Sequence, residues 1–175
     1  MTACGSLKPL GAAGSHLSSV STAAVEDGRR RVYLHPGHAD IGLSPTIISC
    51  ILGSCVEVCL WESKLKIGGA VHYVLPGKPD VPFQNSGTQK IEDLIWRMRG
   101  AGANPRHLVG KIFGGACVLL ALRSNHIGMR NVATARACLS KARIAIVEEN
   151  VGGDQGRKVV FLTDTGETCM NLIEK

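Results

Sequence analysis

The chain has few aromatic residues and no long hydrophobic run. Phe, Trp and Tyr together make up 4% of its 175 residues, so the core must consist mainly of aliphatic side chains. No stretch approaches the roughly 18 consecutive apolar residues that a membrane-spanning helix requires, and the first residues lack the apolar segment of a secretory signal. We therefore expect a cytoplasmic globular protein without membrane insertion.

Clustered charge is also scarce. Charged residues make up 19% of the chain, with a formal net charge of +6. Basic residues are dispersed, with one short run at residues 29–31, and aromatic side chains that could stack on bases are rare. The positive charge favours acidic partners, but the pattern does not predict a nucleic-acid binder.

The 7 cysteines lack the regular spacing of a disulfide framework, and nothing directs the chain to an oxidising compartment. We therefore expect free thiols. The spacing of Cys50, Cys55, Cys59 and His72 matches no common structural zinc site, so a zinc site is not expected there.

Composition changes near residue 30. Residues 1–30 are rich in Gly, Ser and Ala without apolar periodicity, which predicts a disordered N-terminal leader followed by one domain over residues 31–175. Helices are predicted over residues 88–99, where apolar residues recur at helical spacing, and over residues 129–141. Short apolar runs predict strands over residues 32–34, 46–52, 56–61, 69–75, 108–113, 144–147 and 158–162. Mixed helices and strands in this order predict a single α/β or α+β domain with helices covering sheet faces.

Cys55 directly follows a Gly-Ser step, and His72 lies on the next predicted strand. If these strands form an antiparallel hairpin, Cys55 at the start of one lies near His72 toward the end of the other. A free thiol has a pKa of about 8.5 and needs such a base to act as a nucleophile. The hydroxyl of Ser49 could hold the imidazole ring, and backbone N–H groups around Gly53 could bind an oxyanion.

Ordinary structural roles remain open for the same residues. Free cysteine is among the most buried residue types, and a strand histidine is more often a satisfied core side chain than a catalyst. Cys59 is expected to face the same side as Cys55 within the core, and Glu57 between them receives no role. The paired glycines at 114–115 and 152–153 are expected to serve turns and close packing.

Several separated blocks of the sequence resemble the chemoreceptor glutamine deamidase family, CheD. The resemblance extends over about residues 31–175. Its blocks are L-G-S-C-V at 52–56, G-G-A-V-H-Y at 68–73, L-P at 75–76, K-I-F-G-G-A at 111–116, I-G-M-R-N-V at 127–132, V-G-G at 151–153 and G-R-K-V at 156–159.

The resemblance implies a three-layer α/β sandwich with mixed β-sheets, similar to the catalytic domain of deamidating bacterial toxins. It implies hydrolysis of glutamine side-chain amides on bacterial chemoreceptors, which releases ammonia and tunes chemotaxis signalling without a cofactor. In the family's catalytic set Cys55 is the nucleophile, His72 is the base, and Ser49 stands where threonine is common. The resemblance also implies association with a CheC-type chemotaxis phosphatase, so a regulatory binding role is the alternative function.

Overall fold

The computed structural model describes residues 28–77, 86–118 and 126–174. The expected leader falls mainly on residues 1–27, which lie outside the described residues. The elements run in the order β1 (Arg30–Tyr33), β2 (Ala39–Gly42), β3 (Thr46–Leu52), β4 (Val56–Glu62), β5 (Ile67–Tyr73), α1 (Gly87–Gly100), the 3-10 helix η1 (Pro105–His107), β6 (Leu108–Gly114), α2 (Ile127–Lys141), β7 (Ala145–Val151), β8 (Arg157–Leu162) and β9 (Thr168–Leu172).

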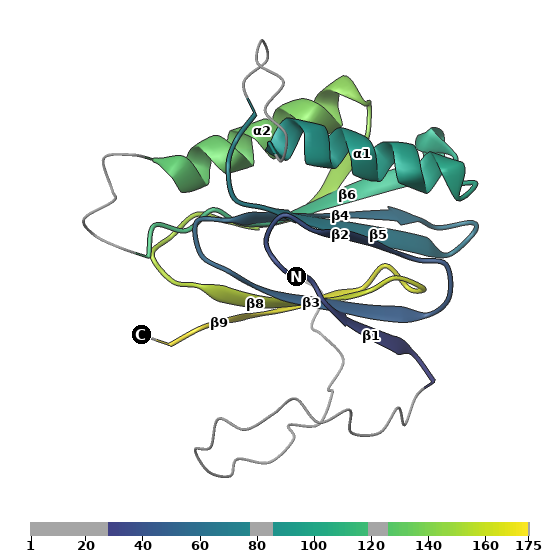
Figure 1. The fold of residues 1–175 in the computed structure, drawn as a ribbon, viewed down its shortest axis with the longest axis horizontal. Helices are drawn as coiled ribbons and strands as arrows, with labels where there is room; N and C mark the ends of the chain where they lie inside the picture. The colour runs from purple at the N-terminus through teal and green to yellow at the C-terminus, as the bar shows by residue number, and fades with distance from the viewer. Residues whose placement is uncertain (1–27, 78–85, 119–125, 175) are drawn as a thin grey trace.

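The elements form three layers (Figure 1). Helices α1 and α2 cover one face of a five-stranded sheet with the order β2-β5-β4-β6-β7, and the other face of this sheet packs on a four-stranded sheet, β1-β3-β8-β9. Both sheets are mixed, because β1 pairs with β3 and β6 pairs with β7 in parallel, whereas the other pairs are antiparallel. The prediction of a three-layer α/β sandwich is confirmed.

Two apolar layers hold the sandwich together, and the central strand β4 contributes to both. Its residues Val56, Val58 and Leu60 pack with the helices, whereas Cys59 packs toward the four-stranded sheet. Side chains alternate between the two faces of a strand, so each odd-numbered residue of β4 faces the layer between the sheets. This layer contains the candidate site.

The helices follow the apolar pattern of the sequence. Ser86 caps α1 by accepting a hydrogen bond from the N–H of Gln89 at 3.3 Å, and Ile91, Leu94 and Met98 are buried as expected. Helix α2 begins slightly earlier than predicted, and its predicted core residues are buried: Val132, Ala135 and Leu139. No helix in the described part of the chain is long and apolar enough to cross a membrane.

Each strand expected from the sequence overlaps an observed strand, but β2 and β9 were not predicted. Both lie at a sheet edge, and most of their residues are partly or fully exposed. Short edge strands need no sustained apolar alternation, so the sequence carries little signal for them. Strand β2 matters for the site because it pairs with β5, the strand that carries His72.

Candidate active site

Strands β4 and β5 form the expected antiparallel hairpin, with Val56 opposite Tyr73 and Glu57 opposite His72. Cys55 directly precedes β4, so this register makes it a diagonal neighbour of His72. Tyr73 packs toward the helices and the adjacent His72 therefore faces the layer between the sheets, where Cys55 also packs. The structure thus places Cys55 and His72 on one face as diagonal neighbours.

The turn at residues 53–55 is held by hydrogen bonds that distant residues donate to its backbone carbonyls. Each of its carbonyls accepts a hydrogen bond, with donor–acceptor distances of 2.8 to 3.0 Å. In a trans peptide the N–H points opposite to the C=O, so the N–H groups of Ser54 and Cys55 face away from these donors. The donors are the backbone N–H groups of Ala116 and Gly115 and the side-chain amide of Asn131.

Gly114 allows this close approach. Its φ of 109° lies in a region that favours glycine, and a Cβ at this position would collide with the carbonyl oxygen of Cys55. Gly115 in turn packs backbone against backbone on Gly128 at the start of α2. The prediction that the glycine pair at 114–115 serves close packing is confirmed.

Asn131 connects the turn to the histidine strand. This fully buried residue of α2 donates through Nδ2 to the carbonyl of Ser54 at 3.0 Å and to the carbonyl of Val74 at 2.8 Å. Tyr73 donates its hydroxyl to the backbone carbonyl of Asn131 at 2.6 Å. Asn131 was not predicted as a site residue. Its one signal in the sequence is a polar amide on the apolar face of a predicted helix.

His72 is buried, and its ring is oriented by a backbone carbonyl. Nδ1 lies 3.0 Å from the carbonyl oxygen of Leu34. A carbonyl only accepts, so Nδ1 carries the proton and the neutral ring keeps its lone pair at Nε2. Nε2 is buried and has no hydrogen-bond partner among the described residues.

Burial also sets the charge states of the pair. It lowers the pKa of His72, an effect that the Leu34 carbonyl opposes and His35 reinforces. Burial raises the pKa of the Cys55 thiol, and a hydrogen bond from the residue's own backbone opposes this. The pair at rest is therefore a neutral thiol beside a neutral imidazole, and the imidazole is ready to accept a proton.

Ser49 lies on β3, where Ile48 and Cys50 point into the layer between the sheets. The alternation of the strand places the Ser49 side chain on the opposite face, and its hydroxyl lies 3.4 Å from the carbonyl of Val32. The backbone carbonyl of Ser49 accepts from the N–H of Leu34 at 2.8 Å. Ser49 is thus linked to the imidazole through the backbone of the residue that orients it.

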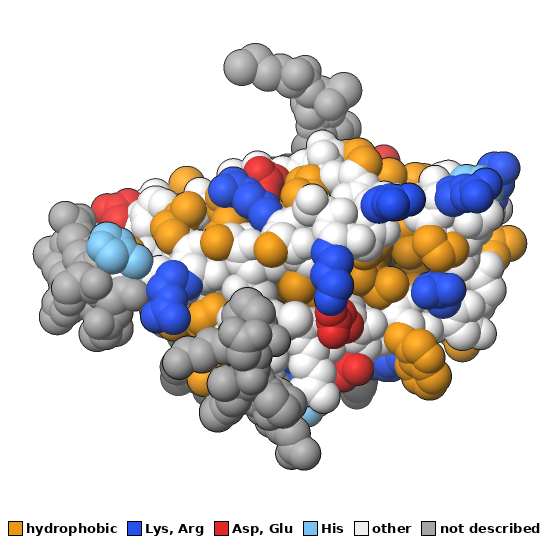
Figure 2. All heavy atoms as spheres, turned by 90° about the horizontal axis from the view of Figure 1, so that it is seen from above, with side chains coloured by type: hydrophobic (Ala, Val, Ile, Leu, Met, Phe, Trp, Pro, Cys, Tyr) orange, Lys and Arg blue, Asp and Glu red, His pale blue; other side chains and the backbone are white. Residues whose placement is uncertain are grey.

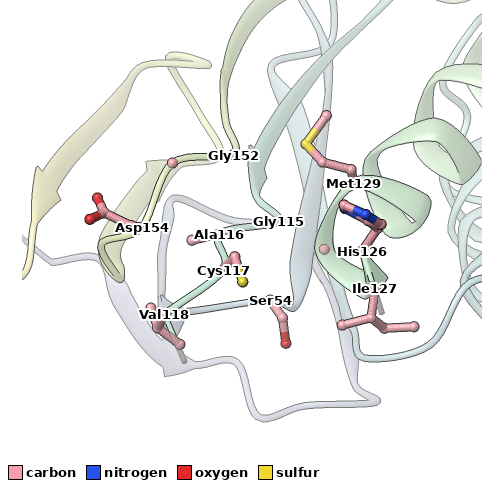
Figure 3. A pocket seen from close by; sticks show the side chains of 12 residues that line it. Ser54, Gly115, Ala116, Cys117, Val118, His126, Ile127, Met129, Gly152 and Asp154 are labelled. Carbon is pink, nitrogen blue, oxygen red and sulfur yellow. The ribbon is translucent and has the colours of Figure 1, made fainter. Parts of the chain in front are cut away.

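A cavity of about 450 Å³ lies beside the turn, and Ser54 forms part of its wall (Figure 3). The thiol of Cys117 points into it next to Ser54. Cys117 was not singled out in the sequence, and its position makes it a rival to Cys55 as nucleophile. Other lining residues include Val118, His126, Met129 and Asp154.

The prediction of free thiols is confirmed for every cysteine in the described ranges. Within those ranges, no group of at least 3 His, Cys, Asp or Glu side chains is arranged to hold a metal ion.

Comparisons with known proteins identify the family. The family model described as CheD chemotactic sensory transduction matches residues 82–171. A probable chemoreceptor glutamine deamidase CheD 1 from Anaeromyxobacter dehalogenans is 41% identical, over 79% of this chain and 82% of the relative. A probable chemoreceptor glutamine deamidase CheD from Sulfurimonas denitrificans is 34% identical, over 82% of this chain and 94% of the relative.

Among solved structures, a Neisseria meningitidis protein of the family model DUF152 is 10% identical with a TM-score of 0.43. The match covers 73% of this chain and 64% of that protein, and the similarity is too low to support an argument. The family assignment rests on the sequence matches: the chain belongs to the CheD family.

Proposed function

We propose that the protein is a cysteine-dependent deamidase that hydrolyses glutamine side-chain amides of bacterial chemoreceptors to glutamate. Membership of the CheD family and the names of its relatives support this activity. The structural observation that carries it is the placement of Cys55 and His72 on one face, with Nε2 of His72 lacking a partner in the described part of the chain. The substrates are cytoplasmic receptor domains, so the reaction takes place in the cytoplasm.

The first half of the reaction forms a thioester. His72 takes the thiol proton of Cys55 at Nε2 as the sulfur attacks the carboxamide carbon, giving a tetrahedral oxyanion. The S–H bond breaks, while N–H and S–C bonds form. The imidazolium then returns this proton to the departing amide nitrogen, which leaves as ammonia when the C–N bond breaks.

The second half returns the enzyme to its starting state. His72 accepts a proton from water, whose oxygen attacks the thioester carbon, and the imidazolium then protonates the sulfur of Cys55 as the S–C bond breaks. The products are a glutamate side chain and the free thiol. Each turnover adds one negative charge to a receptor helix, where it repels neighbouring glutamates and so changes signalling.

The backbone of the turn would stabilise the oxyanion. The carbonyls of residues 53 and 54 are each bound by a donor, which directs the N–H groups of Ser54 and Cys55 away from those donors. Two N–H donors fixed beside the sulfur form an oxyanion site that needs no rearrangement during the reaction.

We propose Ser49 as the third residue of the site, acting through its backbone. Its carbonyl holds the N–H of Leu34 at 2.8 Å, and the carbonyl of Leu34 accepts from Nδ1 of His72 at 3.0 Å. The chain of contacts fixes the tautomer that leaves Nε2 free to act as a base.

The helix layer offers a surface for acidic partners. Figure 2 shows Lys and Arg side chains spread over this layer, in keeping with the net charge of +6. Receptor helices rich in glutamate would be attracted to such a surface. A CheC-type phosphatase is a second proposed partner, to be tested by co-elution with the purified protein. The basic residues of α1 and α2 are Lys90, Arg97, Arg99, Arg130, Arg136 and Lys141.

The proposed activity is tested by measuring ammonia released from a purified receptor cytoplasmic fragment. Cys55→Ala should abolish release and leave the fold intact, because it removes the nucleophile from a small side chain. Cys117→Ala is the matched control, because its thiol lines the neighbouring cavity. If Cys117→Ala is inactive and Cys55→Ala is active, the nucleophile has been assigned to the wrong cysteine.

A further inference from the structure

The mechanism above leaves one buried carboxyl group unused. Glu57 is completely inaccessible to solvent, and in the β4–β5 ladder it lies directly opposite His72. Side chains opposite each other in an antiparallel pair point to the same face, so the carboxyl and the imidazole share the layer between the sheets. Burying a carboxyl group there is costly unless its surroundings compensate.

The surroundings of Glu57 compensate only one of its oxygens. Cys50 donates to Oε2 with an Sγ–O distance of 3.2 Å, and Cys59 also forms a side-chain hydrogen bond with the carboxyl. Oε1 has no partner among the described residues, and the same holds for Nε2 of His72. A buried acceptor without a donor and a buried base without an acid thus lie on facing positions of adjacent strands.

The other titratable groups that face this layer form no ion pair with Glu57 within the described residues. Thiols come from Cys50 of β3 and from Cys55 and Cys59 beside Glu57 on its own strand. Lys111 of β6, opposite Cys59, is paired with Glu148 at 2.8 Å. Arg157 of β8 is buried on the same face as Val159, and its guanidinium bonds Asn150 and the carbonyl of Gly152. His35 lies near enough to lower the pKa of His72. The imidazole of His72 is the group on the position facing Glu57 that can become a cation.

We propose that Glu57 is a positioning residue whose carboxylate stabilises the imidazolium that forms when His72 accepts the proton of Cys55. The proposal rests on the proposed function to the extent that His72 is the base. Burial raises the pKa of Glu57 to about 7 and lowers that of His72. Two facing groups that interact by more than about one pK unit titrate as a coupled pair.

The register explains why the carboxylate favours proton transfer from Cys55. Residues opposite each other on antiparallel strands have Cα atoms roughly 4.5–5.5 Å apart, whereas residues two apart on one strand are separated by roughly 6.8 Å. Glu57 is opposite His72 and two residues from Cys55. Its negative charge therefore stabilises the imidazolium more than it destabilises the thiolate.

The test follows the ring of His72 by NMR as a function of pH in the free enzyme. In the parent, the interaction between the two groups should give a two-step titration with one step near neutrality. Glu57→Gln keeps the shape and removes the charge, so the ring should titrate in a single step at lower pH. Identical single-step curves for the two proteins would overturn the proposal.

Glu62→Gln is the matched control. Glu62 is a second buried glutamate on β4, but its carboxyl accepts from the N–H groups of Lys64 and Leu65 and pairs with His107. Its substitution should leave the His72 curve unchanged, and a change as large as that of Glu57→Gln would refute a specific pairing.

Alkylation of Cys55 by iodoacetamide gives a second readout. At about pH 8, Glu57→Gln should lower the rate of alkylation about threefold. This factor follows from the difference between the Glu57–His72 and Glu57–Cys55 separations. An unchanged rate would contradict the argument from the register. If Glu57→Gln does not fold, the titration of Glu57 is followed by NMR of its carboxyl carbon in the parent and in His72→Gln. The titration step of Glu57 near neutrality should shift between these two proteins.

Neither readout requires a receptor. A protein that fails to deamidate receptors but shows the coupled titration would refute the proposed function and leave the proposal for Glu57 standing. Receptor deamidation without a coupled titration would support the proposed function and refute the proposal for Glu57.

Discussion

Asn131 provides a direct test of how the fold joins the two halves of the site. Its side-chain amide donates to the carbonyls of Ser54 and Val74. Ser54 directly precedes the nucleophile Cys55, and Val74 directly follows β5, the strand that carries His72. Asn131→Ala removes both bonds and leaves two carbonyls without their donor. A net loss of 0.5–1.5 kcal/mol for each bond, with part of the desolvation penalty, predicts a decrease of about 2–4 kcal/mol in the free energy of unfolding.

Catalysis should fall as well, because the turn is no longer held in place relative to His72. We expect kcat to fall by about tenfold or more, since small displacements of reacting groups are costly. Leu139→Ala is the control, because it opens a cavity in α2 near Gly110, away from the turn, and costs about 2–5 kcal/mol. Urea denaturation and steady-state ammonia release measure the two effects. If the two variants are equally destabilised and both keep the parent kcat, Asn131 does not position the site.

Three further results are expected. His72→Ala should lower kcat by roughly 10²–10⁴, the usual effect of a positioned acid–base group, and an undiminished rate would remove it from the mechanism. The pKa of Glu57 is raised from 4.5 to about 7, so the folded state binds this proton more tightly and stability is lost as pH rises through that interval. At 1.36 kcal/mol per unit the loss is about 3 kcal/mol, and denaturation of Glu57→Gln across pH should lack it. Ser49→Ala keeps the backbone link to Leu34, so kcat should change less than about threefold, whereas a larger loss would show that the hydroxyl itself acts on the imidazole.

Patterns within one element, or within two neighbouring elements, could be predicted from the sequence. The spacing of Ile91, Leu94 and Met98 predicted the buried stripe of α1, and the two apolar runs around a polar turn predicted the β4–β5 hairpin. The hairpin alone was enough to bring Cys55 and His72 together. The same local logic explains why β2 was missed, because four residues at a sheet edge show no alternation to detect.

The remaining parts of the site depend on contacts between distant segments. The group that orients His72 is the backbone carbonyl of Leu34, and a carbonyl has no side-chain signature in the sequence. Asn131 reaches Ser54 from a different layer, and Glu57 acquires its significance from the strand register and from a thiol on another sheet. Such relations become visible only when the sheets are stacked.

The central claim is that this protein converts receptor glutamine to glutamate at Cys55. It is tested most directly by the intact mass of a purified chemoreceptor cytoplasmic fragment after incubation with the parent protein or with Cys55→Ala. The account predicts a gain of about one mass unit for each modified glutamine with the parent, from exchange of an amide for an acid, and none with the variant. A receptor fragment whose mass is unchanged by the parent, or changed equally by Cys55→Ala, would contradict it.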